Sequence, residues 1–431
     1  MDKPLKIAVA GLGTVGAGVL KLLAEHGDLL ERRCGRKVVV TAVSALDPNK
    51  DRGVPLDGFE FFQDSAKMAA QADADVIVEL IGGEDGIAKE TVEAAIAASR
   101  HVVSANKALI AHHGTDLALK AEVAGVTLAY EAAVAGGIPI IKALREGFAG
   151  NAIKSVHGIL NGTCNYILSR MRDEGLEFDE VLSDAQALGY AEADPGFDID
   201  GVDAAHKLAI LASLAFGRQV DFNGVHIEGI RHISQLDMHF AEELGYRIKL
   251  LGIASQNGQG ITQRVHPCLV PIDAQIASVE GVFNAVVAEG DFVDTLMMEG
   301  RGAGEGPTAS AVCADIADIA RDNTLPAFGI AAANLKAAET LPMKRHKGAY
   351  YIRLMVIDRP GIFADIAATL RDNEVSMESI LQHGRGAPGE AVPVVLTLHE
   401  TEEIRAAAVI ETISGFDGLL QAPVMIRIEN L

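Results

Sequence analysis

Short apolar runs alternate with helical stretches over the first 130 residues. Strand-like runs occur at 6–10, 38–43, 76–80 and 102–104, and a helical pattern separates them, most clearly over 87–99. Uniformly apolar runs are typical of parallel strands that are buried on both faces. The alternation of strand and helix favours a doubly wound sheet. We therefore predict a Rossmann-like domain over residues 1–130.

The pattern changes after residue 130, where the predicted strands become longer. Strands are expected at 155–160, 247–255, 261–267 and 283–289, and helices at 165–174, 179–188 and 201–216. We interpret residues 131–304 as an α+β domain for catalysis and dimerisation. A further strong helical stretch, 308–321, leads us to expect that residues 305–335 pack back on the first domain.

The last part of the chain has the order of elements of a ferredoxin-like module. Strands are predicted at 350–357, 375–382, 392–399 and 424–428, and helices at 361–371 and 402–413, which gives βαββαβ over residues 348–431. The preceding segment, 334–347, contains Pro342 and a basic cluster, so a solvated linker is expected there. The whole chain is thus predicted to combine α/β and α+β parts.

Composition narrows the class of function. The chain has 431 residues, is 49% hydrophobic and carries a net charge of -22. Such an acidic chain is a poor candidate for binding nucleic acid or an anionic membrane surface. There is no run of 18 apolar residues and no apolar leader, and the four cysteines are widely spaced, as expected of a protein of the reducing cytoplasm.

A glycine-rich loop joins the first predicted strand to the first helix. In this context G-x-G-x-x-G is typical of dinucleotide binding, with the pyrophosphate on the helix N-terminus. The predicted cofactor loop consists of Gly11, Leu12, Gly13, Thr14, Val15 and Gly16. The choice between NAD and NADP stays open: Lys50 and Arg52 could meet a 2′-phosphate, which favours NADP slightly, or they could simply be exposed.

The segment 185–207 concentrates acidic residues at the start of one helix. Asp200 is placed to cap that helix, and Asp203 and Lys207 share a helix face. Such a pair is often an ordinary surface ion pair. Here the same face continues through Ile210 and Leu214, and a lysine on a buried face needs a partner or a task.

This segment closely resembles the homoserine dehydrogenase signature, A-x3-G-Y-A-x2-D-P-x2-D-x-x-G-x-D-x3-K, with every fixed position matched from Ala185 through Lys207. Segments 104–107, 131–139, 161–166 and 302–310 are also similar to loops of that family. The family interconverts aspartate 4-semialdehyde and homoserine with NADPH or NADH. The resemblance therefore implies a reversible oxidoreductase of threonine and methionine biosynthesis.

The resemblance also implies roles for individual residues. Lys207 and Lys107 would be catalytic, because an ammonium group can stabilise the negative oxygen that forms on hydride transfer and can supply its proton. We favour Lys207 as the donor and Lys107 as the orienting group, although the sequence leaves the choice open. The implied substrate-binding residues are Glu192, Asp198, Asp203, Thr163 and Gly162, and the implied further cofactor contacts are Asn106, Lys107 and Gly304.

Two further sites follow from resemblance. The family can hold a sodium ion through backbone carbonyls, which correspond to Val134, Gly136 and Ile138 with Glu131 nearby, although Gly136 and Gly137 also fit a flexible turn. Residues 358–363 resemble the D-x-P-G loop of ACT domains. This implies feedback inhibition by an amino acid, threonine first, or a module that serves oligomerisation alone. A homodimer or homotetramer is expected.

Two other functions remain to be distinguished. A dehydrogenase of the same fold that acts on another amino aldehyde would explain the glycine loop, but not Glu192, Asp203 and Lys207 together. A catalytically silent amino-acid sensor would be expected to lack one or more polar residues of the site, and none is missing.

Overall fold

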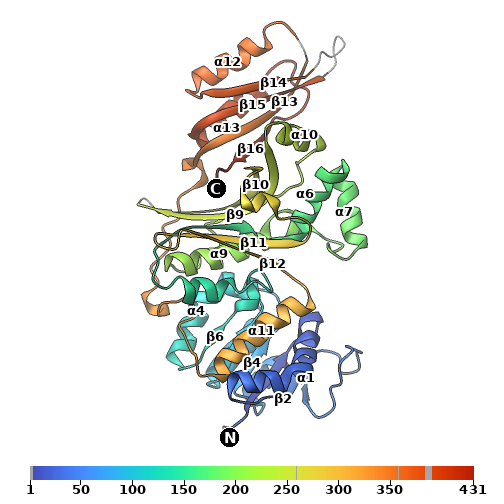
Figure 1. Ribbon diagram of the computed structural model, residues 1–431, viewed down its shortest axis with the longest axis vertical. Helices are drawn as coiled ribbons and strands as arrows, with labels where there is room; N and C mark the ends of the chain where they lie inside the picture. The colour runs from blue at the N-terminus through green and yellow to red at the C-terminus, as the bar shows by residue number, and fades with distance from the viewer. Residues whose placement is uncertain (1–2, 259, 358, 384–390) are drawn as a thin grey trace.

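The computed structural model describes residues 3–258, 260–357, 359–383 and 391–431. Figure 1 shows three parts stacked along the long axis, with the N-terminal sheet at one end and the C-terminal module at the other. The segment 305–320 returns to the N-terminal end. Among the helices of these described ranges, none is long and apolar enough to cross a membrane.

The first part is a six-stranded parallel sheet in the order β3-β2-β1-β4-β5-β6. This is the strand order of a Rossmann fold, so the predicted doubly wound sheet is confirmed. The short strands β3 and β6 had no counterpart in the sequence prediction. The elements are β1 (Leu5–Ala10), α1 (Thr14–Cys34), β2 (Val38–Ser44), β3 (Glu60–Phe62), α2 (Ser65–Gln71), β4 (Val76–Glu79), α3 (Ile87–Ala97), β5 (His101–Ser104), α4 (Lys107–Val123) and β6 (Leu128–Ala129).

Helix α11 (Glu305–Ala320) lies against α1 in this part (Figure 1). Residues of both helices share one apolar cluster with the sheet, among them Val19 and Val312. The approach is close at Gly18, where a Cβ atom would lie 2.6 Å from the side chain of Glu305. A late segment of the chain therefore completes the first part.

The middle part contributes strands β12-β11-β7-β9-β10 to a second, ten-stranded sheet. Helix α9 packs on this sheet: its Leu208 lies near Gly252 of β9, and Gly201 at its start lies near Val265 of β10. The elements are β7 (Ile153–Ile159), α6 (Gly162–Glu174), α7 (Phe178–Ala187), α8 (Gly196–Ile199), α9 (Val202–Phe216), β8 (His226–Ile227), α10 (Gln235–Glu243), β9 (Tyr246–Asn257), β10 (Gly260–Pro271), β11 (Phe283–Gly290) and β12 (Thr295–Arg301).

The C-terminal part has the predicted ferredoxin-like arrangement, with strand order β16-β13-β15-β14. It does not stand apart, because β16 pairs in parallel with β10 and makes one continuous sheet with the middle part. Arg353 of β13 also donates to Asp237 of α10, Nε to Oδ1, at 2.7 Å. The elements are β13 (Lys347–Ile357), α12 (Ile362–Asp372), β14 (Met377–Gln382), β15 (Ala391–Glu402), α13 (Glu403–Ser414) and β16 (Val424–Ile428).

The segment 334–347 is only partly the solvated linker that its composition predicts. Most of its side chains are exposed, including those of the lysines. Its backbone, however, is bound to the sheet, since Leu341 N donates to Ile261 O at 2.7 Å. The His346 side chain is turned inward, and burial beside Arg264 and Arg427 lowers its pKa to about 3. Of this basic cluster, Lys344 and Lys347 are thus exposed to solvent, whereas His346 is turned toward the interior.

Candidate active site

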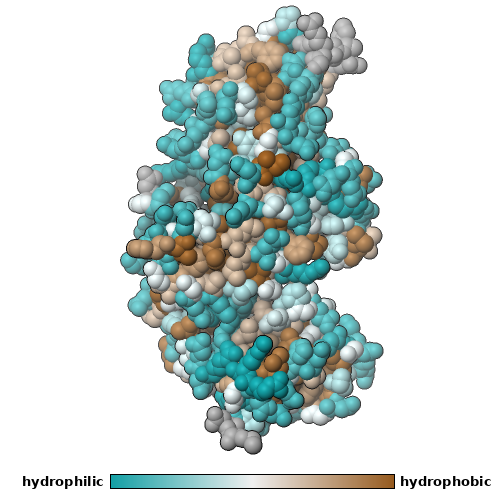
Figure 2. Space-filling view, in the orientation of Figure 1, coloured by the Kyte–Doolittle hydropathy of each residue, from teal (hydrophilic) through white to brown (hydrophobic). Residues whose placement is uncertain are grey.

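A cavity of about 810 Å³ lies where the first sheet meets the middle part. In Figure 2 the outline of the molecule narrows at this level. The loops that follow β4 and β5 line one side, the loops around α6 to α9 line another, and residues 301–304 complete the wall. The predicted site residues among the lining are Val15, Asn106, Lys107, Gly136, Gly162, Thr163, Glu192, Asp198, Asp203, Lys207 and Gly304.

The glycine loop has the geometry that a bound dinucleotide needs. Gly11 has a left-handed φ of 94°, and a Cβ there would lie 2.6 Å from the carbonyl oxygen of Leu80. A Cβ on Gly16 would lie 2.1 Å from the carbonyl oxygen of Gly11, so helix and loop touch there. Around Gly13, by contrast, the space is open, and α1 begins without a side-chain cap. The free N–H groups of this helix start suit a pyrophosphate.

Arg52 and Lys50 follow β2, close to the glycine loop. The Arg52 guanidinium donates to the carbonyl oxygen of Leu12 at 3.2 Å and to that of Lys50 at 2.6 Å. Neither residue is among the lining of the cavity. The positively charged guanidinium of Arg52 is therefore hydrogen-bonded to the glycine loop, where the adenosine end of a dinucleotide would lie.

Asp203 is the centre of the charged cluster on the cavity wall. Lys107 Nζ lies 2.7 Å from Asp203 Oδ1, and Lys207 Nζ lies 2.7 Å from Oδ2. Lys207 also donates to the carbonyl oxygen of Leu160 at 2.6 Å. The side chains of Asp203 and Lys207 are 4% and 9% exposed, so the pair is not a surface ion pair. The side chain of Lys107 is 35% exposed, so it is the more open of the two lysines, both of which line the cavity.

The protonation of the three groups follows from burial and proximity. Burial opposes ionisation of Asp203, yet Lys207 and Lys107 together hold its pKa below the usual value. Burial lowers the pKa of Lys207, and the neighbouring charge of Lys107 adds to the effect. For Lys107 burial acts in the same direction, but Asp203 outweighs it and raises the pKa. Lys207 therefore gives up its proton more readily than Lys107 does.

Asn161 connects this cluster to Asp198. Its Nδ2 donates to Asp203 Oδ2 and to Asp198 Oδ1, both at 2.8 Å, while its Oδ1 caps helix α6. Burial and the charge of Asp203 raise the pKa of Asp198. The prediction that Asp200 caps α9 is wrong: Gly201 is the N-cap, and the Asp200 carboxylate pairs with Arg231 instead.

The remaining predicted substrate residues lie at the edge of the cavity. Glu192 is exposed, and its charge contributes to the raised pKa of Lys107. Thr163 Oγ1 donates to the carbonyl oxygen of Tyr190 at 2.8 Å. Gly162 allows a close backbone approach, because a Cβ there would lie 2.7 Å from the carbonyl oxygen of Val282. All of these residues line the same cavity as Asp203.

The loop predicted to bind sodium is well packed. Both carboxylate oxygens of Glu131 accept backbone N–H groups, those of Ile141 and Lys142, at 2.9 Å. Burial raises the pKa of Glu131 to about 7. A Cβ on Gly136 would lie 2.5 Å from the carbonyl oxygen of Gly302. Glu131 is therefore used by the protein itself, and Val134 and Ile138 are not among the lining of the cavity.

Asn284 is a residue of the cavity wall that the sequence did not single out. Its side chain is buried against Gly302, and neither Oδ1 nor Nδ2 has a hydrogen-bond partner in the described part of the chain. A buried amide without a partner costs free energy unless a ligand satisfies it. No local pattern marks this asparagine, which is the second residue of strand β11.

The C-terminal module carries the glycine of the predicted effector loop. Gly361 has a φ of 95° and is the N-cap of α12. Arg359 Nη2 donates to Asp365 Oδ2 at 2.9 Å. Asp358, the first residue of the D-x-P-G motif, lies outside the described residues.

Three family models match successive parts of the chain. They are described as "Homoserine dehydrogenase, NAD binding domain" over residues 11–131, "Homoserine dehydrogenase" over 139–317 and "ACT domain" over 350–416. These matches agree with the three parts of the fold and confirm its predicted class, including the ACT module.

Relatives match over the full length. The homoserine dehydrogenase of Neisseria gonorrhoeae is 46% identical over 435 residues, covering 100% of this chain and 99% of that protein. The crystal structure of a homoserine dehydrogenase from Thiobacillus denitrificans has a TM-score of 0.93 and 43% identity, covering 99% of each chain. A hyperthermophilic archaeal homoserine dehydrogenase in complex with NADPH has a TM-score of 0.65 and 25% identity, covering 75% of this chain and 100% of that one.

These matches decide among the three functions considered from the sequence. A full-length relative at 46% identity supports the enzyme with the specific signature over a dehydrogenase of another amino aldehyde or a silent sensor. The match of residues 11–131 to the NAD-binding model confirms that the first part of the chain is a nicotinamide-binding domain. The chain therefore belongs to the homoserine dehydrogenases, NAD(P)-dependent oxidoreductases that act on a CH–OH group.

Proposed function

We propose that the cavity beside Asp203 is where aspartate 4-semialdehyde and homoserine are interconverted, with Lys207 as the proton donor and Lys107 as the orienting group. The observation that carries this proposal is the single buried carboxylate, Asp203, shared by two ammonium groups at 2.7 Å each. The nicotinamide cofactor, when bound, supplies or accepts the hydride.

The two lysines have different tasks because their surroundings differ. Lys207 is buried and held by Asp203 and the Leu160 carbonyl oxygen, so its ammonium group has a fixed position. Its lowered pKa favours transfer of a proton to an oxygen that becomes negative as the aldehyde is reduced. Lys107, more exposed and with a raised pKa, stays charged and stabilises the same oxygen.

The acidic residues of the cavity account for recognition of an amino acid. Glu192 and Asp198 line the cavity and offer carboxylates to a substrate ammonium group. Gly162 and Thr163, at the start of α6, offer backbone N–H groups to a carboxylate. An aldehyde without an ammonium group and a carboxylate would lack both interactions.

NADPH is the proposed cofactor, and a sodium ion is proposed for the loop after Glu131. Arg52, fixed beside Leu12, favours NADPH over NADH, because a 2′-phosphate gains a charge-assisted contact there. For sodium, the backbone carbonyls of Val134, Gly136 and Ile138 remain the proposed ligands. Glu131 would hold the loop in shape, since its oxygens already accept two N–H groups.

Regulation and assembly are proposed from the C-terminal module and the sheet edge. The helix start at Gly361 suits the carboxylate of an amino-acid effector, threonine first. A homodimer or homotetramer is supported by apolar side chains exposed on and beside the edge strand β12, Phe292 and Leu296 among them. The cytoplasm is kept as the proposed compartment.

The test of the catalytic assignment is a pair of isosteric variants with a matched control. Lys207→Met is expected to lower kcat by about 10²- to 10⁴-fold, the usual contribution of a positioned proton donor. Lys107→Met should also lower kcat, with a larger rise in the KM for the aldehyde, because its ammonium group faces the cavity. Both are measured by nicotinamide absorbance with homoserine or the semialdehyde.

Lys249→Met is the control, because Lys249 is another buried lysine that lies outside the cavity lining and binds Asn165 Oδ1 at 3.2 Å. It is expected to lower thermal stability while kcat stays close to that of the unmodified protein. Near-normal kcat in Lys207→Met, with the fold intact by circular dichroism, would show that the donor is another group.

A further inference from the structure

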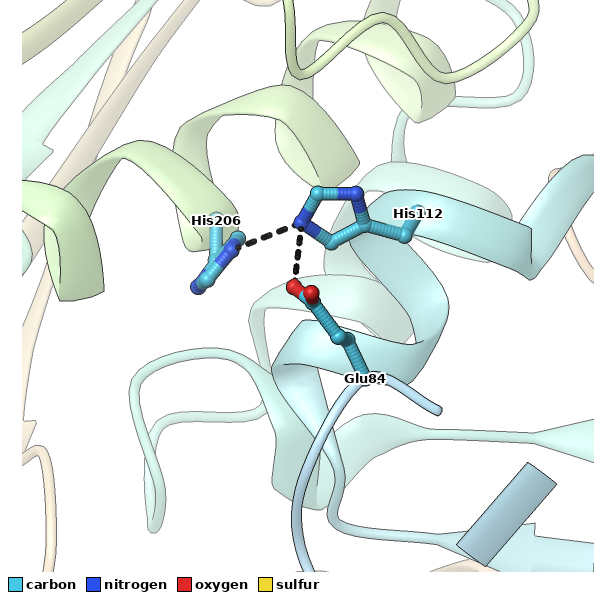
Figure 3. Close-up of side chains that lie close together, drawn as sticks. All are labelled: Glu84, His112 and His206. Carbon is cyan, nitrogen blue, oxygen red and sulfur yellow. Dashed lines mark hydrogen bonds and ion pairs between the residues drawn. The ribbon is translucent and has the colours of Figure 1, made fainter. Parts of the chain in front are cut away.

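Three side chains from separate elements converge beside the cavity, and the reaction uses none of them. Glu84 lies in the loop after β4, His112 on α4 and His206 on α9 (Figure 3). His112 Nε2 lies 3.2 Å from His206 Nε2 and 3.0 Å from Glu84 Oε2. The three possible ligand atoms all lie within 4.8 Å of one another.

The contacts around His112 Nε2 cannot both be ordinary hydrogen bonds. If His112 Nε2 carries a hydrogen and donates it to Glu84, it has no lone pair to accept a hydrogen from His206. If it accepts from His206, two lone-pair atoms face each other at the contact with Glu84. In the first case one hydrogen is shared by two acceptors, and in the second case the contact with Glu84 has no hydrogen. A cation would satisfy the lone pairs of all three groups at once.

The atoms and their spacing suit a transition metal. Two imidazole nitrogens and one carboxylate oxygen are a common protein donor set for zinc. With metal–ligand bonds of about 2.0 Å in a tetrahedron, neighbouring ligand atoms are about 3.3 Å apart. The two separations from His112 Nε2, 3.0 and 3.2 Å, are close to that value, and the third pair of ligand atoms lies within 4.8 Å. A fourth position remains for water.

The surroundings allow an ion to enter and to stay. The Glu84 and His112 side chains are 54% and 26% exposed, which leaves a route from solvent. His206 is buried, and its ring packs against the rings of Phe197 and Phe222. The carboxylate of Glu84 supplies one negative charge to the ion.

The other cluster of this kind in the described ranges, His266, Cys268 and Glu429, is a weaker candidate. Both oxygens of Glu429 accept hydrogen bonds from Arg264 at 2.9 Å, so this carboxylate is already neutralised. Arg427 adds a second positive charge near His266. An ion there would have to displace a buried arginine.

We propose that Glu84, His112 and His206 form a binding site for a divalent transition-metal ion, with zinc as the representative. The ion would link the two helices that carry the lysines of the cavity. His112 lies on α4, which begins at Lys107, and His206 precedes Lys207 on α9. The ring of Phe197 lies near both groups: its centre is 5.5 Å from the Lys107 ammonium nitrogen and 5.5 Å from the centre of the His206 ring.

The experiment measures zinc binding by the full chain without cofactor or substrate. Protein freed of metal with a chelator is titrated with zinc chloride by calorimetry, and bound zinc is counted after desalting. One zinc per chain is expected, with a higher melting temperature. Cobalt(II) should show the visible absorption of a tetrahedral site with nitrogen and oxygen ligands.

The variants identify the ligands. His112→Gln and Glu84→Gln are expected to weaken zinc binding about tenfold or more and to abolish the shift in melting temperature. His113→Gln is the matched control on the same helix, because His113 binds Asp85, at 3.0 Å, and not the cluster. His113→Gln should bind zinc like the unmodified protein.

Three outcomes would overturn the proposal. Absence of zinc binding would mean that the three side chains form a hydrogen-bonded group only. Equal affinity in His112→Gln, or equal loss in His113→Gln, would mean that zinc binds elsewhere on the surface. His206→Gln could disturb the core, so the decision rests on the two partly exposed positions. None of these readouts depends on turnover, so they are independent of the proposed roles of Lys107 and Lys207.

Discussion

Replacing Gly13 by alanine separates cofactor binding from folding. The Gly13 backbone has φ −78° and ψ −161°, which alanine adopts readily, and no atom lies within 4 Å of the added Cβ. The fold should therefore tolerate the change. Stability should stay the same or rise by about 0.4–1 kcal/mol, because alanine restricts the unfolded chain.

Binding of the dinucleotide should respond differently. A methyl group on Gly13 stands where the pyrophosphate approaches the backbone. Crowding of a close contact by one methyl group costs about 1–3 kcal/mol, which corresponds to a rise in Kd of about 5- to 150-fold. The Kd is measured by quenching or enhancement of reduced-nicotinamide fluorescence, and stability by thermal unfolding of the same preparation.

Gly16→Ala is the contrasting variant. Its Cβ would lie 2.1 Å from the carbonyl oxygen of Gly11, so the loop or helix must move. We expect both a lower melting temperature and weaker cofactor binding. Normal cofactor affinity in Gly13→Ala would refute the reasoning, because the pyrophosphate would then not pass over this residue.

Three further predictions concern other parts of the molecule. Arg52→Ala should raise the KM for NADPH about tenfold or more and change that for NADH little, as steady-state kinetics with both cofactors would reveal. Burial lowers the pKa of His157 to about 4 from the usual 6.5, so the unfolded chain binds more protons between those values. Stability should therefore fall as pH drops through that window, by up to about 3 kcal/mol from this residue, and His157→Gln should flatten a plot of unfolding free energy against pH. Asp237→Asn leaves the Arg353 guanidinium, which is 7% exposed, without a carboxylate partner. The free energy of unfolding should fall by about 3–5 kcal/mol, visible as a lower melting temperature. An unchanged melting temperature would mean that the C-terminal module is held by its strand pairing alone.

The sequence alone predicted those parts of the site that depend on residues close together in the chain. The G-x-G-x-x-G loop is fixed by strand, turn and helix within a few residues, and the Asp203–Lys207 pair follows from their spacing on one helix. Asp200 was misjudged because Gly201 begins α9 in a left-handed conformation, with φ 87°, and Asp200 pairs with Arg231, 31 positions further along the chain.

Contacts between distant segments account for what could not be foreseen. The pairing of β10 with β16 joins Cys268 to Arg427, and nothing in either strand marks its partner. The meeting of His112 and His206 needs α4 and α9 to pack together first. Asn284 reaches the cavity only because β11 is placed beside the loop at Gly302.

The continuous sheet has a consequence for communication between its ends. Strands joined by hydrogen bonds cannot change their twist one at a time, so a distortion imposed on β13 to β16 extends to β10. Val265 of β10 lies beside Gly201, the N-cap of α9, two residues before Asp203. A molecule that bends the terminal module thus has a short mechanical route to the carboxylate between the two lysines, without crossing any loop.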